Sequence, residues 1–470
     1  MTIPPDVLQL LNLQLGAEKV LTDPVDCLPY GYDNSRLQAQ PDAVVFPTTH
    51  QDVLAIVKLC VQHKIPLTPR GRGTGTTGAT VPTEGGIVMS MERMTRILEI
   101  SPDDRLMVVE PGVTNQAVQN AAAKHGFFWP PDPTSAAVCT IGGNLAYNSA
   151  GPRAVKYGTP REHTLGLRGV AGSGEEIRTG TRTTKGVVGY DLTRLLIGSE
   201  GTLAIITEAT LKLTPLPETK RTLQAIYTDI NSAARAVSRI MAQPVVPCAL
   251  EFIDGAAIDM VRRYSTVALP DKAGALLMIE IDGPLAAMDD MQKAVSTAAK
   301  NKGLLSLQSA NTEQEIKALW ATRKALSPAL RNVAPKKINE DVVVPVSQIP
   351  ILISGLESLA VKHEVTIVNF GHAGNGNIHV NLLLDPDDAE QSLRATACLD
   401  AVFSLVLSLG GTLSGEHGTG LVKKDYISRE IDPVSLQFMQ HIKAIFDPSN
   451  ILNRDKAFLA PRPQKLASPS

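Results

Sequence analysis

A short segment rich in histidine and glycine, GHAGNGNIHVN at Gly371–Asn381, constrains the local fold of this chain most strongly. Its central Asn375-Gly376 pair favours a two-residue turn between two paired strands. In that register His372 lies directly opposite His379, with Cβ atoms about 4.5–5.5 Å apart. Two imidazoles at this spacing can share one metal ion. The segment therefore predicts a β-hairpin that carries two metal ligands.

A second segment, SGEHGTG at Ser414–Gly420, supplies further candidate ligands. Glu416 can provide a third ligand through its carboxylate, and the adjacent His417 then remains to act as a base. Asn381 lies two residues beyond His379, so both side chains leave the same face of their strand. Together these residues predict a metal site with an open position and a neighbouring proton acceptor.

Composition limits the classes of function. With 470 residues the chain is long for one core, so two or three domains are expected. A formal net charge of −2, without long runs of either sign, leaves no electrostatic footprint for nucleic-acid binding. The five cysteines form no CxxC pair, which fits a reducing compartment and excludes an iron–sulfur cluster ligated by this chain alone. Without a signal-like start or a long apolar run, we expect a cytoplasmic protein, with peripheral contact to the inner membrane left open.

A glycine-rich loop, PRGRGTGTTGAT at Pro69–Thr80, contains a formal match to the dinucleotide fingerprint at Gly73, Gly75 and Gly78. That fingerprint requires a following helix, which the residues Val81–Gly86 (VPTEGG) cannot start. The loop also lacks the Lys-Ser/Thr ending of a P-loop. Its backbone N–H groups can still form a concave nest for phosphate oxygens. Two further small-residue segments, 131–151 and 196–208, predict that the same domain wraps an extended ligand.

Several motifs together resemble a known family. PRGRGTGTTGA, DPTSAAVCTIGGNLAYNSAG and GSEGTLAIITEATLKLTP are similar to the FAD domain of the vanillyl-alcohol oxidase superfamily. GHAGNGNIHVN, SGEHGTGLVKKDY and IKAIFDPSNILNRDKAF narrow the resemblance to FAD-linked D-2-hydroxyacid dehydrogenases, which include D-lactate dehydrogenases, the flavin subunit of glycolate oxidase and D-2-hydroxyglutarate dehydrogenase. The expected helices and strands, taken with the resemblance, predict an α+β fold in five parts. A helical lead-in at 1–37 precedes a two-subdomain FAD-binding domain at 38–217 and a substrate- and metal-binding cap domain with a largely antiparallel sheet at 218–420. A C-terminal segment at 421–460 returns to the flavin, and a disordered tail follows at 461–470.

The resemblance implies noncovalently bound FAD. In the first loop the pyrophosphate would be held by Arg70, Gly71, Arg72, Gly73, Thr74, Thr76, Thr77 and Gly78. In the second segment the ribityl chain and flavin ring would be lined by Pro131, Thr134, Ser135, Gly142, Asn144 and Gly151. In the third segment the ribose or adenine would be reached by Glu200, Gly201 and Ile206. Asn453 would approach the isoalloxazine, within Asn-Arg-Asp-Lys where the family favours Asn-Pro-Gly-Lys, which predicts an altered turn.

The resemblance also implies a reaction. His372, His379 and Glu416 would bind a divalent ion, zinc above all, although these ligands also suit iron or manganese. The ion would ligate the C2 hydroxyl and carboxylate of a 2-hydroxy acid. His417 would accept the hydroxyl proton while a hydride passes from C2 to flavin N5. Asn375, where many relatives have aspartate, suits the same turn and leaves these ligands unchanged.

Three further residues or pairs bear on the substrate. Arg323, on a predicted helix, would clamp the substrate carboxylate with a fork geometry that lysine lacks. Asn381 would contact the hydroxyl or the carboxylate. Lys336 and Lys337 lie near a position where relatives recognise a second substrate group, and a dicarboxylate would need a cation there. D-lactate or glycolate is the first expectation for the substrate and D-2-hydroxyglutarate the second.

The resemblance leaves partners and alternatives open. An external acceptor, whether a quinone, a cytochrome or an electron-transfer flavoprotein, must reoxidise the flavin, and dimeric relatives imply a homodimer. The chain could also be the flavin subunit of a multi-component glycolate oxidase, inactive without its partners. A flavin-free metal hydrolase using His372, His379 and Glu416 is a third interpretation, but it leaves the three glycine-rich segments without a role.

Overall fold

The computed structural model of the chain describes residues 3–264, 269–310 and 312–457, which fall into two compact units. The first unit contains the described residues of Met1–Ala150, Gly158–Leu216 and Glu416–Ser470. The second contains those of Gly151–Tyr157 and Pro217–Gly415, so the short segment 151–157 groups with the second unit. The tail predicted to be disordered, 461–470, lies outside the described residues.

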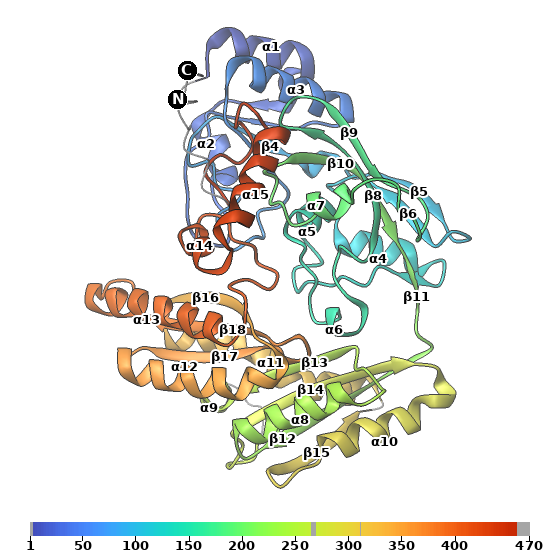
Figure 1. The fold of residues 1–470 in the computed structure, drawn as a ribbon, viewed down its shortest axis with the longest axis vertical. Helices are drawn as coiled ribbons and strands as arrows, with labels where there is room; N and C mark the ends of the chain where they lie inside the picture. Colours follow the sequence, from blue (N-terminus) through green and yellow to red (C-terminus); the bar gives the residue numbers. More distant parts are fainter. Residues whose placement is uncertain (1–2, 265–268, 311, 458–470) are drawn as a thin grey trace. The chain divides into compact units, whose positions relative to one another are not determined.

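A four-stranded sheet with the order β1-β2-β4-β3 begins the first unit. Figure 1 labels its strand β4. Strands β2 and β3 pair in parallel with β4, whereas β1 pairs antiparallel with β2. Leu11, Val53 and Ile56 from helices α1 and α3 belong to the core beside this sheet. The side chain of Thr49 caps α3 by accepting a hydrogen bond from the N–H of Asp52. The bounds are α1 Pro5–Leu15, β1 Val20–Leu21, α2 Pro24–Cys27, β2 Ala43–Val45, α3 His50–His63, β3 Leu67–Arg70 and β4 Ile87–Ser90.

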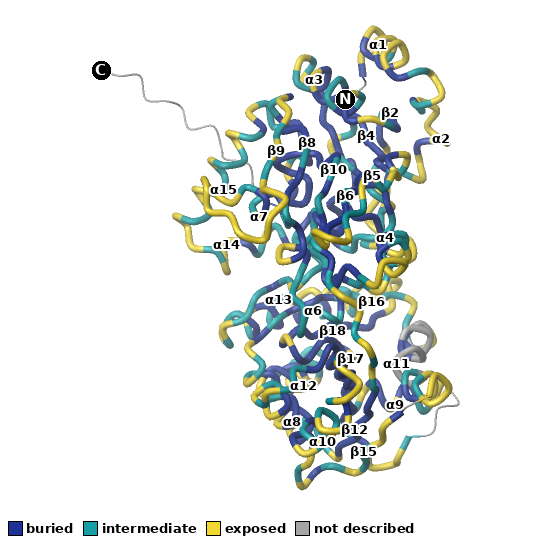
Figure 2. Tube along the Cα trace, turned by 90° about the vertical axis from the view of Figure 1, so that its right-hand side faces the viewer, coloured by how far each residue is buried: buried dark blue, intermediate teal, exposed yellow. Residues whose placement is uncertain are grey.

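The first unit also contains a five-stranded antiparallel sheet with the order β5-β6-β10-β8-β9 and a small two-stranded sheet of β7 and β11. Its central strands β8 and β10 are mostly buried (Figure 2). Trp129 and Ile141 belong to its core, and Ile442 of the C-terminal helix α15 packs against that core. The bounds are β5 Ile97–Ser101, β6 Leu106–Val109, α4 Asn115–Ala123, β7 Phe127–Phe128, α5 Ile141–Tyr147, β8 Thr164–Ala171, β9 Glu176–Gly180, α7 Leu192–Leu196, β10 Ala204–Lys212, β11 Thr214–Pro215, α14 Ile427–Glu430 and α15 Pro433–Phe446.

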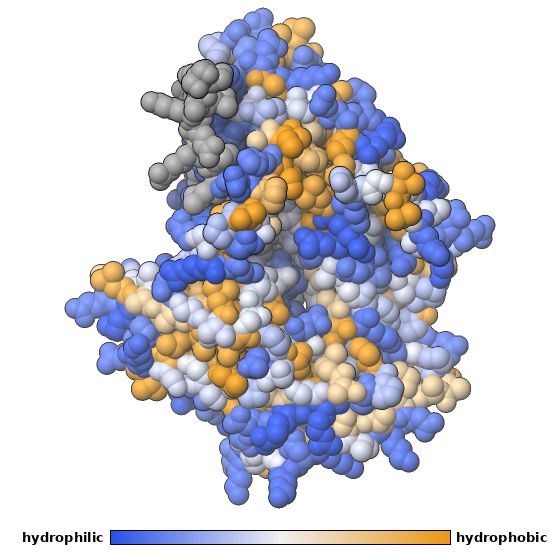
Figure 3. Space-filling view, in the orientation of Figure 1, coloured by the Kyte–Doolittle hydropathy of each residue, from blue (hydrophilic) through white to orange (hydrophobic). Residues whose placement is uncertain are grey.

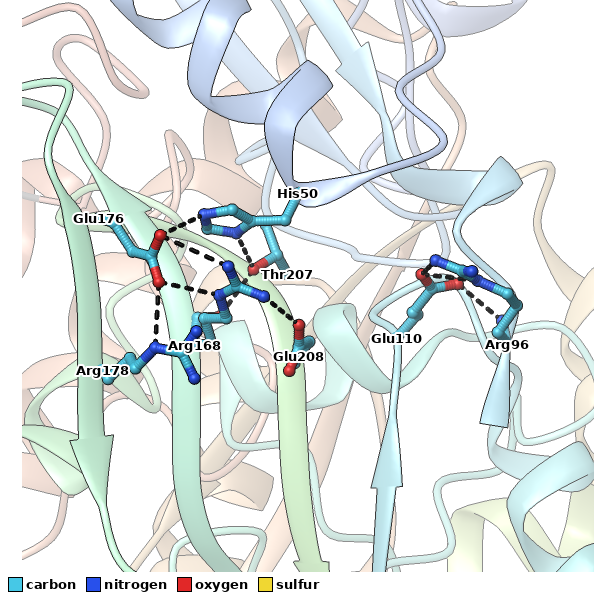
Figure 4. A network of polar contacts seen from close by, with 8 residues as sticks. All are labelled: His50, Arg96, Glu110, Arg168, Glu176, Arg178, Thr207 and Glu208. Atoms are coloured by element: carbon cyan, nitrogen blue, oxygen red, sulfur yellow. Dashed lines mark hydrogen bonds and ion pairs between the residues drawn. The ribbon is translucent and has the colours of Figure 1, made fainter. Parts of the chain in front are cut away.

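A polar network ties α3 to this five-stranded sheet (Figure 4). His50 contacts Thr207 Oγ1 through Nδ1 at 2.8 Å and Glu176 Oε2 through Nε2 at 3.1 Å. Arg168 and Arg178 each donate to Glu176 at 3.0 Å, and the Arg168 hydrogen bond holds the pKa of Glu176 down to about 2. The network therefore fixes the helix and three strands of the sheet to one another.

The second unit is built on a seven-stranded antiparallel sheet with the order β15-β12-β14-β13-β17-β18-β16. Helices α9 and α11 pack on the face that carries Ile253, Met278 and Phe370. Helices α8, α10, α12 and α13 cover the other face (Figure 1). The bounds are α6 Ala154–Tyr157, β12 Thr219–Tyr227, α8 Ile230–Ala242, β13 Ala249–Asp254, α9 Gly255–Tyr264, β14 Ala275–Gly283, α10 Met288–Ala299, β15 Leu304–Ala310, α11 Glu313–Val333, β16 Lys336–Val343, α12 Ile349–His363, β17 Thr366–His372, β18 Asn377–Leu384 and α13 Ala389–Ser408.

The predicted α+β class, with a largely antiparallel sheet in the second half of the chain, is confirmed. Helix α15 carries exposed apolar side chains at Val434, Phe438 and Ile445, and hydrophobic atoms gather over it in the space-filling view (Figure 3). Among the residues that the structure describes, no helix combines the length and apolar composition needed to cross a membrane.

Candidate functional site

A cavity in the first unit is walled by all three glycine-rich segments. The predicted cofactor residues that line it are Arg70, Gly71, Gly142, Glu200, Gly201, Ile206 and Asn453. Those that do not line it are Arg72, Gly73, Thr74, Thr76, Thr77, Gly78, Pro131, Thr134, Ser135 and Asn144, with Gly151 in the second unit. The cavity therefore collects part of each predicted segment.

The first loop leads into strand β4 without an intervening helix, so the rejection of the dinucleotide fingerprint is confirmed. The loop instead packs closely against the second segment. A Cβ added at Gly71 would lie 2.5 Å from Oγ1 of Thr140, and one added at Gly142 would lie 2.7 Å from Cβ of Pro111. Only glycine allows the backbone to approach this closely, so these two positions shape the cavity wall.

Arg70, predicted to hold a pyrophosphate, has its guanidinium engaged within the protein. Nη1 donates to the carbonyl oxygen of Tyr32 at 2.7 Å and to Oγ1 of Thr80 at 3.2 Å. Asp33, which the sequence analysis did not single out, accepts a hydrogen bond from the N–H of Gly78 at 3.0 Å. These contacts fasten the first loop to the N-terminal segment, so the described contacts of Arg70 support the loop.

The C-terminal turn at Asn453 returns to the cavity wall despite its departure from the family pattern. The side-chain amide of Asn453 donates to the carbonyl oxygen of Glu200 at 2.6 Å, and the backbone N–H of Asn453 donates to the carbonyl oxygen of Leu67 at 3.0 Å. Lys456 Nζ donates to Asn453 Oδ1 at 3.0 Å and to the carbonyl oxygen of Ala79 at 3.1 Å. Burial lowers the pKa of Lys456 to about 7. Asn453 is therefore held from both sides of its turn.

Glu200 connects the cavity to the segment that carries the predicted base. Its carboxylate accepts hydrogen bonds from the N–H of Thr419 at 2.7 Å and from the N–H of Gly420 at 2.8 Å. Thr77 Oγ1 donates to the carbonyl oxygen of His417 at 3.2 Å. Burial raises the pKa of Glu200. In the described contacts Glu200 therefore positions the segment around His417, a role different from the predicted ribose or adenine contact.

The histidine hairpin forms in the second unit, but its predicted two-residue register is wrong. His372 pairs with Asn377, and Phe370 pairs with His379. The loop is a 3₁₀ turn over Ala373–Asn375 (η6) followed by Gly376 at φ 74°. A two-residue type I′ turn needs positive φ at both central residues, and Asn375 does not adopt it. Because the register shift is two residues, both histidines still leave the same face of the sheet.

The two imidazoles lie side by side in this arrangement. Their ring centroids are 5.2 Å apart with an interplanar angle of 84°. His372 Nδ1 forms a hydrogen bond with Oε1 of Glu251 on the neighbouring strand β13. Phe370 lies against His379, with ring centroids 5.9 Å apart. Two closely spaced neutral imidazoles are a ligand set that divalent transition ions accept, so the described residues fit the predicted ion.

Asn381 lies on the same face of β18 as His379, as predicted, but it is fully buried. Its Nδ2 donates to the carbonyl oxygens of Val368 at 3.1 Å and His379 at 3.0 Å, and its Oδ1 accepts from Asn339 at 2.6 Å. These bonds use both amide hydrogens. The described geometry therefore gives Asn381 a role in holding β18, and its contact with substrate stays a prediction.

Arg323 belongs to helix α11, which packs on the same face of the sheet as the two histidines, but its side chain lies outside the described residues. Lys336 and Lys337 begin strand β16. Lys337 shares a face with Asp341, which pairs directly with His379, whereas Lys336 points to the other face. Of the two lysines, Lys337 is thus the one on the histidine face.

Gly415, the last residue of the second unit, is held by strand β16 and immediately precedes Glu416 in the chain. The N–H of Gly415, the preceding residue, donates to both the carbonyl oxygen and Oδ2 of Asp341 at 2.9 Å. Asp341 in turn is the register partner of His379. Within the first unit, Glu416 Oε2 accepts a hydrogen bond from the N–H of Ala150 at 3.2 Å. Glu416 is thus held within the first unit by Ala150, and its place beside the two histidines stays a prediction.

Sequence reasoning missed three residues of this site: Asp33, Glu251 and Thr140. Glu251 had a detectable signal, because it is an acidic residue within the otherwise apolar strand ALEFI at 249–253. Thr140 caps α5 by accepting from the N–H of Gly143, and a threonine before an apolar run is a recognisable cap. Asp33 lies in an irregular segment whose contacts are distant in sequence, so no local pattern points to it.

Comparisons with known proteins agree with these features. Residues 216–457 match the family model "FAD linked oxidases, C-terminal domain", and residues 41–180 match "FAD binding domain". The chain is 40% identical over 457 residues to "Glycolate oxidase subunit GlcD" of Bacillus subtilis, covering 97% of both chains. It is 33% identical over 427 residues to "D-lactate dehydrogenase" of Anaerostipes hadrus, covering 89% of this chain and 90% of the relative. Its fold resembles that of p-cresol methylhydroxylase with substrate bound, with a TM-score of 0.76, 18% identity and 95% coverage of both chains.

Proposed function

Since the chain belongs to the family of FAD-linked oxidases and is an FAD-dependent oxidoreductase, we propose that it oxidises a D-2-hydroxy acid, D-lactate or glycolate, to the 2-oxo acid. One observation carries the proposal: Glu200 lines the glycine-walled cavity and also holds Thr419 and Gly420. The segment that bears His417 is therefore fastened to the wall of the cavity that would hold FAD. That arrangement supports a base that works beside a flavin.

The cofactors would supply the redox chemistry and the acidity: FAD accepts a hydride at N5, and a divalent ion lowers the pKa of a hydroxyl that it ligates. We assign the ion to His372, His379 and Glu416, of which the first two share one sheet face. His417 would take the proton from the substrate hydroxyl. Arg323 would orient the substrate through its carboxylate, since a guanidinium fork matches two oxygens at once.

A second candidate substrate, D-2-hydroxyglutarate, rests on the placement of Lys337. This lysine shares a face of β16 with Asp341, the register partner of His379, four residues away. Four residues of strand span about 13 Å, a distance that a dicarboxylate and a long lysine side chain together can largely bridge. We propose D-lactate or glycolate first, because the relatives reported above bear those names, and D-2-hydroxyglutarate second.

The oxidised flavin must be regenerated by an acceptor outside the chain, and we propose a quinone, a cytochrome or an electron-transfer flavoprotein. A relative with 40% identity is named as a subunit. This name supports the alternative that the chain works with partner proteins, as the flavin subunit of a multi-component glycolate oxidase. Purification of the native protein from its source would show whether an iron–sulfur protein accompanies it.

Anaerobic reduction of the bound flavin tests the proposal. The purified holoprotein, mixed with D-lactate or glycolate in the absence of oxygen, is expected to lose its visible flavin absorbance. L-lactate serves as the control because it has the same charge and size with the opposite configuration. Equal bleaching by D-lactate and L-lactate would refute the assignment. It would also be refuted if D-lactate, L-lactate, glycolate and D-2-hydroxyglutarate all left the flavin oxidised.

A further inference from the structure

Glu251 is a buried acidic residue that the proposed reaction does not use. It lies in strand β13 between the apolar residues Leu250 and Phe252, and only 2% of its surface is exposed. A carboxylate in such a position is costly unless it is hydrogen-bonded or paired. Glu251 is the register partner of His372 on β17, and its Oε1 contacts Nδ1 of that histidine. The two side chains therefore form a buried pair across neighbouring strands.

This contact indicates the tautomer of His372. A carboxylate accepts, so Nδ1 must carry the hydrogen, and the lone pair of the neutral ring is then on Nε2. The contact also fixes the rotation of the ring. His379 lies against this ring, with centroids 5.2 Å apart and its ring nearly perpendicular. The carboxylate thus prepares one of two adjacent imidazoles in the tautomer that a divalent ion requires.

We propose that Glu251 is a positioning residue that orients His372 and raises its affinity for a divalent ion. The inference rests on the proposed metal centre and extends it to a residue that would not touch the ion. Through the hydrogen bond at Nδ1, the negative charge of Glu251 makes the imidazole of His372 a stronger electron-pair donor to a metal ion. Outer carboxylates of this kind typically change metal affinity 10- to 100-fold.

A second buried carboxylate on the same sheet face provides a matched control. Glu280 on β14 accepts hydrogen bonds from Lys220 Nζ at 3.0 Å, Thr222 Oγ1 at 3.0 Å and Trp320 Nε1 at 3.1 Å. None of these partners is a histidine. Glu280→Gln therefore removes a buried negative charge from the same sheet and leaves the Glu251–His372 contact in place.

The experiment measures zinc affinity directly. The proteins are prepared with FAD bound and metal removed, as wild type, Glu251→Gln and Glu280→Gln. Each is titrated with Zn²⁺ against a chromophoric chelator, and flavin content is recorded as a check on folding. We expect wild type to bind one Zn²⁺, Glu251→Gln to bind it 10- to 100-fold more weakly, and Glu280→Gln to stay within about threefold of wild type. Because the lost group positions a ligand, saturating Zn²⁺ should restore full occupancy of Glu251→Gln.

Three results would overturn the inference, and the first two separate it from the proposed function. Wild-type affinity in both Glu251→Gln and Glu251→Ala, with one ion bound to wild type, would remove the positioning role and leave the metal centre standing. Failure of wild type itself to bind a divalent ion would remove the metal centre and the inference together. An equal loss in Glu251→Gln and Glu280→Gln would also contradict it, because the effect would then belong to any buried carboxylate of this sheet.

Discussion

Replacing Gly376 with alanine tests how the hairpin loop sets the positions of the two histidines. Gly376 adopts φ 74°, a conformation that costs a non-glycine residue about 1–2 kcal/mol. A Cβ added there would lie 1.8 Å from the carbonyl oxygen of Val344, whereas real contacts of this kind stay above 3.0 Å. The loop or the neighbouring segment must therefore separate by at least 1.2 Å, the difference between these two values.

That separation is large enough to break two backbone hydrogen bonds. The N–H of Gly376 donates to Ala373 at 3.0 Å, and the N–H of Val344 donates to Gly376 at 3.1 Å. Each such bond contributes about 1 kcal/mol net. Added to the strain at positive φ, the expected loss is about 3–4 kcal/mol of stability in the second unit. A shift of this size between catalytic groups also lowers turnover about 100-fold.

Gly410→Ala is the matched control for this variant. Gly410 adopts nearly the same φ, 71°, but an added Cβ would meet nothing within 4 Å. It should lose only about 1–2 kcal/mol and keep wild-type zinc content. Both variants are compared by urea unfolding followed by circular dichroism, and by bound zinc and flavin. Equal stability and equal zinc content of Gly376→Ala and Gly410→Ala would refute the argument that the close approach to Val344 sets the hairpin.

Three further predictions follow from the site. His417→Ala should retain FAD and zinc but reduce the flavin with D-lactate 10²- to 10⁴-fold more slowly in stopped-flow experiments, and an unchanged rate would exclude it as the base. Lys337→Ala should raise the KM for D-2-hydroxyglutarate and leave that for D-lactate unchanged; equal effects on both would remove the second candidate substrate. Burial lowers the pKa of Lys456 to about 7, so the unfolded state binds its proton more tightly, and stability should rise as pH rises from about 7 towards 10.5, by up to about 1.4 kcal/mol per pH unit. Lys456→Met should flatten that rise in unfolding curves measured across this range, and an unaltered slope would contradict the assignment.

The sequence patterns predicted which residues gather in the hairpin better than they predicted the geometry of its turn. Both histidines were assigned correctly to one sheet face, because an even shift of register preserves the face of every residue. The exact turn could not be predicted, since Asn375-Gly376 is compatible with both a two-residue turn and a longer loop. The close packing of Gly376 against Val344 comes from a neighbouring segment more than thirty residues earlier in the sequence, so no local pattern contains it.

The roles of charged residues were harder to predict than their positions. Arg70 and Glu200 both line the cavity, yet both side chains form hydrogen bonds within the protein. Arg70 contacts Tyr32 and Thr80, and Glu200 contacts Thr419. These partners are separated from Arg70 and Glu200 by between ten and more than two hundred residues of sequence. Motif spacing identifies which residues gather at a site, but it does not say which side chains form hydrogen bonds within the protein.

The most direct test of the account compares flavin reduction by D-lactate and by glycolate in metal-free and zinc-reconstituted holoprotein, under anaerobic conditions in a stopped-flow spectrometer. We predict rapid bleaching of the flavin by at least one of these acids in the reconstituted protein, and a rate that falls by two or more orders of magnitude when zinc is removed and recovers when it is returned. Rapid reduction at equal rates with and without the ion would contradict the claim that His372, His379 and Glu416 form the metal centre of a D-2-hydroxy acid dehydrogenase.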